Sequence, residues 1–164
     1  ILETGTYTGI SAMYMGQGCK DNGLGEVLSL EITPGHQQRA EELWKRVGVD
    51  QQVKCRLQYS LSYLPQENEP VYDLLFLDSE PEYRFEELVR FYPYLKPGGY
   101  IFIHDLHRHM SQEPHEKYFG WPFGELPIEI KNWVKDGELR PIHFPTPRGL
   151  LGLYKTHPSD YKWV

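Results

Sequence analysis

Short apolar segments alternate along this chain with segments whose apolar residues recur every three or four positions. The apolar segments have the length of buried strands and span residues 27–31, 53–57, 72–78 and 100–104. The segments with helical spacing span residues 10–14, 34–47, 85–92 and 130–134. Because such alternation builds a parallel sheet with helices on both faces, it predicts a doubly wound α/β fold.

Glycine and proline residues mark the expected ends of several elements. Thr33 and Pro34 predict the start of a helix that Gly48 ends. The glycines between Gly16 and Gly25 predict a loop that follows the short first helix.

The second half of the chain carries a different pattern. The sequence Lys-Pro-Gly-Gly at 96–99 predicts a turn that leads into the strand at 100–104. Residues 107–127 show no periodicity, which predicts a long functional loop or a lid. The segments 139–144 and 150–154 flank a proline-containing turn and predict an antiparallel pair that closes the sheet.

Length, charge and cysteine content limit the function classes. The 164 residues fit one domain over residues 1–164, and no apolar run approaches the roughly 18 residues of a membrane span. Without such a run we expect a soluble protein that binds no membrane. The net charge of −6 argues against nucleic acid as the main partner. Cys19 and Cys55 lack the spacing of a zinc module or a disulfide framework, so we expect a cytoplasmic location. Because the chain begins at Ile1 rather than at Met, we also expect that an N-terminal segment is missing.

A turn with two glycines occupies residues 3–9, which read Glu-Thr-Gly-Thr-Tyr-Thr-Gly. Gly5 and Gly9 either let the backbone approach a ligand closely or only join a strand to a helix. Glu31 ends the next predicted strand, at a distance from the turn where an acid binds the ribose hydroxyls of a nucleoside cofactor. Tyr7 stands where a dinucleotide site needs its second glycine. The turn therefore favours a nucleoside ligand without a pyrophosphate.

The same turn resembles the first motif of the class I S-adenosylmethionine-dependent methyltransferases, especially the small-molecule O-methyltransferases. That motif has the form Glu-x-Gly-Thr-x-x-Gly-x-Ser, and here it runs from Glu3 to Ser11. The similarity continues at residue 31 and at residues 72–78, 95–100 and 148–154. It covers nearly the whole chain and implies a Rossmann-like sheet of seven strands, mostly parallel, with an antiparallel last strand.

The resemblance also implies a set of cofactor-binding residues. Glu3 and the turn after it would hold the amino acid portion of S-adenosylmethionine, and Glu31 would bind its ribose. Ser60 would lie near the adenine, where the neighbouring Tyr59 either stacks on the base or only packs. The cofactor-binding residues expected in this way are Glu3, Gly5, Thr6, Tyr7, Gly9, Ser11, Glu31, Tyr59, Ser60 and Asp78.

Polar residues at the ends of two later strands form a candidate acceptor site. Asp78 follows one strand and His104 and Asp105 end the next, so the three should meet at the carboxyl edge of the sheet. In one branch of the family the matching residues hold a divalent cation, which implies a Mg²⁺ or Mn²⁺ site at these three residues. Alternatively no metal binds, and His107 or His104 takes the proton of the acceptor. The aromatic residues at 118–123 either line an acceptor pocket or form a packed cover.

Together these residues predict an enzyme that transfers a methyl group from S-adenosylmethionine to an oxygen of a small-molecule acceptor. A nicotinamide-dependent oxidoreductase would share the sheet and Glu31, but Tyr7 disfavours it. A non-catalytic nucleoside-binding module would keep Gly5, Gly9 and Glu31 and lose the polar cluster at the strand ends. Formation of a homodimer stays open.

Overall fold

The computed structural model describes residues 1–65, 72–104, 128–144, 146 and 149–157. The helices and strands in these residues are β1 (Leu2–Thr4), α1 (Ile10–Asn22), β2 (Val27–Glu31), α2 (Pro34–Val47), β3 (Val53–Leu57), η1 (Ser60–Ser62), β4 (Tyr72–Leu77), α3 (Arg84–Phe91), η2 (Tyr92–Tyr94), β5 (Leu95–His104), α4 (Ile128–Lys135), β6 (Leu139–Phe144) and β7 (Leu150–Lys155). The elements η1 and η2 are short 3₁₀ helices.

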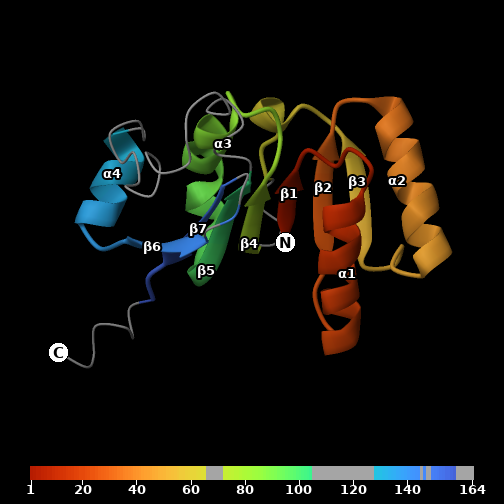
Figure 1. The fold of residues 1–164 in the computed structure, drawn as a ribbon, viewed down its shortest axis with the longest axis horizontal. Helices are drawn as coiled ribbons and strands as arrows, with labels where there is room; N and C mark the ends of the chain where they lie inside the picture. Colours follow the sequence, from red (N-terminus) through yellow and green to blue (C-terminus); the bar gives the residue numbers. More distant parts are fainter. Residues whose placement is uncertain (66–71, 105–127, 145, 147–148, 158–164) are drawn as a thin grey trace.

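The strands form one sheet in the order β3-β2-β1-β4-β5-β7-β6 (Figure 1). The pairs from β3 to β5 are parallel, whereas β7 runs antiparallel to both β5 and β6. The chain order reverses between β1 and β4, which is the point where ligands bind in open α/β sheets. The sheet with its reversed last strand therefore confirms the predicted fold class.

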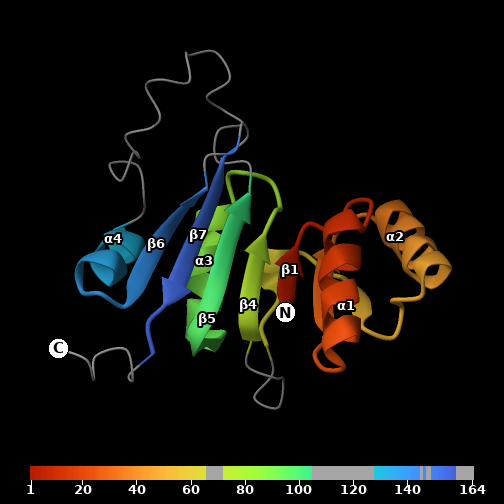
Figure 2. The same cartoon turned by 60° about the horizontal axis from the view of Figure 1, so that its bottom comes forward.

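Helices cover both faces of the sheet, as Figure 2 shows with α1 in front and α3 behind. On the side of α1 and α2, Ala12, Ala40 and Trp44 pack with Val27 of β2. On the other side, α3 and α4 pack on a larger core that includes Leu30 of β2. Val27 and Leu30 point to opposite faces because side chains alternate along a strand, and each is buried on its own side. This is the doubly wound arrangement that the sequence predicts.

Several predicted boundaries coincide with the structure. The segments 27–31 and 53–57 are β2 and β3, and α2 begins at Pro34 as expected. Gly48 ends α2 with a positive φ of 75°, the left-handed conformation that favours glycine at this position. The predicted closing pair is β6 and β7.

The predicted loop at residues 16–25 is confirmed only for residues 23–25, because α1 continues through Asn22. Gly16 lies on the buried side of this helix, where an added Cβ atom would be 2.3 Å from Cγ2 of Val53 in β3. The glycine is therefore required for the close approach of a helix to a strand, and does not mark a loop.

The predicted turn at residues 96–99 is wrong, because these residues belong to β5, which begins at Leu95. The register of β5 against β4 shifts between Tyr72 and Leu74, where the longer stretch of β5 is accommodated. The φ of Gly98, at 85°, is in the left-handed region at this irregularity. The glycines thus bend a strand here and do not end one.

No helix in the described parts of the chain has both the length and the hydropathy that a membrane span requires. Cys19 and Cys55 are both free thiols.

We expect Gly16→Ala to lower the free energy of unfolding by about 1–3 kcal/mol, because the added methyl group overpacks the contact between α1 and Val53. Gly18 in the same helix is the matched control, since a Cβ atom there meets nothing within 4 Å. Gly18→Ala should stabilise the protein by about 0.5–1 kcal/mol through helix propensity. Urea denaturation checks both variants, and equal effects of the two would contradict the close approach.

Candidate functional site

A cavity of about 570 Å³ opens at the carboxyl edge of the sheet. The five parallel strands from β3 to β5 all contribute to its wall at or just after their ends. These residues are Gly5 after β1, Glu31 of β2, Tyr59 after β3, Asp78 after β4 and His104 of β5. Its volume is in the range of cavities that hold small molecules and cofactors.

The glycine turn after β1 packs closely against the end of β4 and against α2. Gly5 has a φ of 84°, and an added Cβ atom would lie 2.5 Å from the backbone oxygen of Asp78. Gly9 has a φ of 75°, and its Cβ atom would lie 2.7 Å from the Cβ of Ala40 in α2. The carbonyl oxygen of Gly9 also accepts a hydrogen bond from the indole of Trp44. Both glycines are therefore needed for contacts within the protein, whereas their expected approach to a ligand stays a prediction.

Glu31 is a buried carboxylate that is oriented by backbone groups. Its Oε2 accepts a hydrogen bond of 2.8 Å from the N–H of Tyr7, whose φ of 47° is unusual for a tyrosine. Its Oε1 accepts bonds of 2.9 Å from the N–H groups of Ile32 and Thr33. Because a carboxylate offers about four lone-pair positions, these three bonds leave capacity for one hydroxyl at Oε2. The side chain is thus fixed in place and can still bind a ligand.

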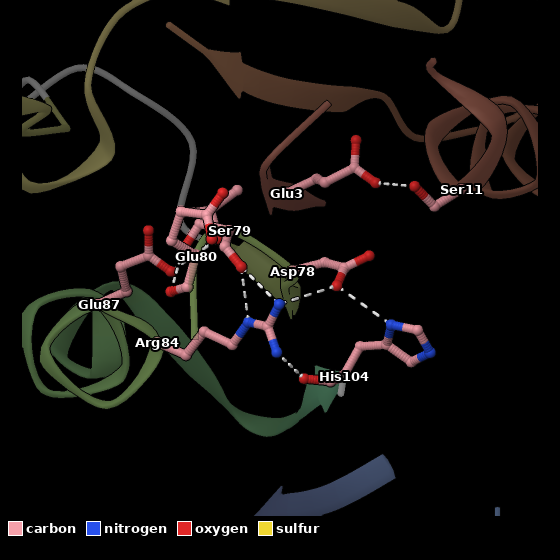
Figure 3. Close-up of polar contacts among 9 residues, drawn as sticks. Glu3, Ser11, Asp78, Ser79, Glu80, Arg84, Glu87 and His104 are labelled. Atoms are coloured by element: carbon pink, nitrogen blue, oxygen red, sulfur yellow. Dashed lines mark hydrogen bonds and ion pairs between the residues drawn. The ribbon is translucent and has the colours of Figure 1, made fainter. Parts of the chain in front are cut away.

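Glu3 is fully buried beneath the same turn and lies outside the cavity wall. Ser11 and Ser29 each donate a hydrogen bond to one of its carboxylate oxygens, and Figure 3 shows the bond from Ser11. Thr6 contacts the hydroxyl of Ser29 at 2.5 Å. Burial raises the pKa of Glu3 to about 7, and the two serine hydroxyls oppose this shift. The glycine turn is therefore held in place by a buried hydrogen-bond network that includes Glu3, Thr6 and Ser11.

The cavity has an aromatic wall beyond Glu31. The rings of Tyr59 and Tyr83 meet edge to face with centroids 5.7 Å apart, and both line the cavity. Ser60 is buried in the same wall, but its hydroxyl donates to Glu87 of α3. Tyr83 was not among the predicted site residues. Its only sequence signal is its position between a strand end and the predicted helix at 85–92.

Asp78 and His104 converge, as the sequence predicts for the ends of adjacent parallel strands. Nδ1 of His104 lies 3.1 Å from Oδ1 of Asp78, and both side chains are about one quarter to one third exposed. Asp105, His107 and the aromatic residues at 118–123 lie outside the described residues. The pair is therefore the part of the expected acceptor cluster that the structure brings together.

Sequence reasoning missed Arg84, which lies against this pair (Figure 3). The guanidinium is almost fully buried, and its Nη2 lies 3.4 Å from Oδ1 of Asp78. Its Nε donates a bond of 2.8 Å to the carbonyl oxygen of Ser79, and its Nη1 donates to the carbonyl oxygen of His104. One side chain of α3 thus connects the ends of β4 and β5.

Glu87 lies one helical turn after Arg84 and is fully buried. Thr4, at the end of β1, donates a bond of 2.8 Å to its Oε2, and Ser60 donates to its Oε1. Burial raises the pKa of Glu87, while hydrogen bonds from Ser60, Ser79 and Thr4 oppose the shift. Glu87 therefore connects α3 to the end of β1 and to η1, which follows β3.

Asp78 and His104 are two of the three residues expected to hold a divalent cation, and the third, Asp105, lies outside the described residues. The described residues contain no group of three histidine, cysteine, aspartate or glutamate residues that could hold a metal ion. Asp78 and His104 are hydrogen-bonded to each other, and the guanidinium of Arg84 is adjacent to the carboxylate that would have to bind the cation. A positive charge at this place disfavours a second one.

The comparisons with known proteins agree with each other. Residues 2–106 match the family model described as a methyltransferase domain. A protein of Mycobacterium sp. (strain JLS) named "Putative O-methyltransferase" is 28% identical over 108 residues, which are 63% of this chain and 47% of that protein. The chain thus spans about half the length of the curated relatives that it matches.

Two solved structures share the fold. The crystal structure of a "putative O-methyltransferase" from Klebsiella pneumoniae has a TM-score of 0.71 at 24% identity, covering 95% of this chain and 72% of that one. The SAH-bound methyltransferase PaMTH1 of Podospora anserina has a TM-score of 0.73 at 20% identity, covering 95% of this chain and 71% of that one.

The raised pKa of Glu3 predicts a pH dependence of stability. The carboxyl group of Glu3 has a pKa of about 7 in the folded protein and near 4.5 in the unfolded chain. The folded protein therefore binds the proton of this carboxyl group more tightly than the unfolded chain does. The free energy of unfolding should therefore fall as the pH rises from 5 to 8, by on the order of 3 kcal/mol from this residue. Glu3→Gln should make this decrease in the free energy of unfolding smaller. It should not abolish the decrease, because burial also raises the pKa of Glu87. Urea denaturation at both pH values checks this, and an unchanged difference in the variant would contradict it.

Proposed function

This chain belongs to the methyltransferase domain family, and from that membership we propose that it transfers the methyl group of S-adenosylmethionine to an oxygen of a small-molecule acceptor. The observation that carries the proposal is that one cavity contains both the oriented carboxylate of Glu31 and the pair Asp78–His104. Glu31 would bind the nucleoside group of the cofactor, and the pair Asp78–His104 would bind the reacting hydroxyl of the acceptor. We propose residues 1–164 as one domain that performs this reaction.

We propose that Glu31 binds the ribose and that Gly5 and Tyr7 form the adjacent wall. The free capacity at Oε2 of Glu31 faces a cavity large enough for the cofactor. Tyr59 supplies a partly exposed ring for the adenine, next to Ser60. When bound, S-adenosylmethionine supplies an electrophilic methyl group and a thioether leaving group.

The protein's own contribution is to bind and orient the acceptor and to accept its proton. An ionised carboxylate only accepts hydrogen bonds, so Nδ1 of His104 donates to Asp78 and leaves Nε2 as an acceptor. Nε2 of His104 then takes the proton from the acceptor hydroxyl, while Asp78 holds the ring and stabilises the resulting charge. Asp105 and His107, which follow β5 in the sequence, complete the proposed acceptor site. With a histidine as the base, this proton transfer needs no divalent cation.

We propose a cytoplasmic location, which the free thiols of Cys19 and Cys55 support. The family match supports neither the nicotinamide-dependent oxidoreductase nor the non-catalytic module. Homodimer formation stays a prediction.

We expect Glu31→Ala to weaken the binding of S-adenosylhomocysteine by about 1.5–3 kcal/mol, or roughly tenfold to 150-fold, because a hydrogen bond to a charged group is lost. Titration calorimetry measures the affinity, and circular dichroism shows whether the variant keeps the secondary structure of the wild-type protein. Glu42→Ala, which removes an exposed carboxylate from α2, is the matched control. Unchanged affinity would mean that Glu31 is not at the ribose. Tighter binding of a nicotinamide dinucleotide than of S-adenosylhomocysteine would overturn the cofactor assignment.

We expect His104→Ala to lower kcat by about 10²–10⁴-fold, the usual contribution of a general base. The affinity for S-adenosylhomocysteine should stay the same, because His104 is at the acceptor end of the site. Release of S-adenosylhomocysteine with a panel of phenols, catechols and aliphatic alcohols measures the reaction. His157→Ala, at an exposed histidine beyond β7, is the control. Full activity of the His104 variant with the best acceptor would exclude this residue as the base.

A further inference from the structure

We propose that the guanidinium of Arg84 takes the electrostatic place of a divalent cation in this acceptor site, so that the site excludes such cations. The inference deepens the proposed function and rests on it for the identity of the site. Its structural basis is independent of any acceptor: a buried positive charge between the ends of β4 and β5, in contact with the carboxylate of Asp78.

Arg84 is committed to the protein through all parts of its guanidinium. Nε and Nη2 donate to the carbonyl oxygen of Ser79, Nη1 donates to the carbonyl oxygen of His104, and Nη2 lies 3.4 Å from Asp78. Only 3% of the side chain is exposed. A buried charge that is fixed by several bonds is costly to displace, because its partners would be left without a donor. The guanidinium therefore stays in place when other charges approach.

Among the described residues, Asp78 is the acid whose carboxylate forms an ion pair with this charge. The nearest buried acid on the same helix, Glu87, accepts hydrogen bonds from Thr4 and Ser60, and burial raises its pKa. A cation bound to Asp78 would compete with Arg84 for the carboxylate and would lie close to the guanidinium in a partly buried site. Like charges repel strongly at such short distances when water is largely excluded.

Arg84 acts through Asp78 and His104 and is therefore a positioning residue. Its bonds to two strand ends fix the spacing of the two side chains, which remain 3.1 Å apart. The guanidinium connects the two strand ends through hydrogen bonds and offsets the charge of Asp78, which a single planar group with five N–H donors is able to do.

The test measures Mn²⁺ binding by the loss of the free-ion electron paramagnetic resonance signal. The wild-type protein should bind Mn²⁺ only weakly, whereas Arg84→Met should bind it at least about tenfold more tightly, because the opposing charge is gone. Adding Asp78→Asn to Arg84→Met should abolish the gain. Arg90→Met is the matched control, because Arg90 lies on the same helix and donates to the carbonyl oxygen of Tyr63 instead.

Two outcomes would overturn the proposal. One is that the wild-type protein binds Mn²⁺ tightly and that Asp78→Asn abolishes this binding. This measurement needs no Arg84 variant, so it remains decisive even if Arg84→Met does not fold. The other is a folded Arg84→Met with no gain in affinity. A titration with S-adenosylhomocysteine in the same samples tests the cofactor assignment separately. A protein that fails to bind S-adenosylhomocysteine would refute the proposed function and leave the Mn²⁺ comparison valid.

Discussion

The first turn of α3 carries two charged side chains into the interior, and the arrangement of the site depends on satisfying them. Arg84 donates to backbone groups at the ends of β4 and β5, and Glu87 accepts hydrogen bonds from Thr4 and Ser60. An unpaired polar group at such depth would cost more than most single contacts supply. The loops that form the cavity are therefore held at the places where these two side chains need partners.

Glu3 and Glu31 show how two buried acids of one site take different tasks. Glu31 accepts three backbone N–H groups and faces the cavity, so its position is fixed while part of it remains available. Glu3 accepts two serine hydroxyls below the turn and lies outside the cavity wall. Both acids belong to the recognisable motifs of the sequence. Only the packing around them distinguishes Glu3, which supports the turn, from Glu31, which faces the cavity.

Sequence periodicity predicts the sheet and the position of Glu31 well, because both depend on local patterns. It fails where glycine serves packing: Gly16 suggests a loop, yet it lies inside α1 against Val53. It also fails for Arg84 and Glu87, since charged residues at the start of a helix usually face water. Their burial depends on strand ends that are remote in sequence, and no local pattern contains that information.

The shared attachment of the strand ends to α3 bears on how such a protein diversifies. Thr4 and Ser60 both donate hydrogen bonds to Glu87, so a substitution at one of them also changes the bond that the other makes. The effects of the two substitutions on stability should therefore be strongly non-additive. Tyr7 and Tyr59 line the same cavity with exposed rings and take no part in these attachments. Substitutions at Tyr7 and Tyr59 can therefore change the cavity surface one at a time. Substitutions at Thr4, Ser60 or Glu87 instead require compensating changes at their hydrogen-bond partners.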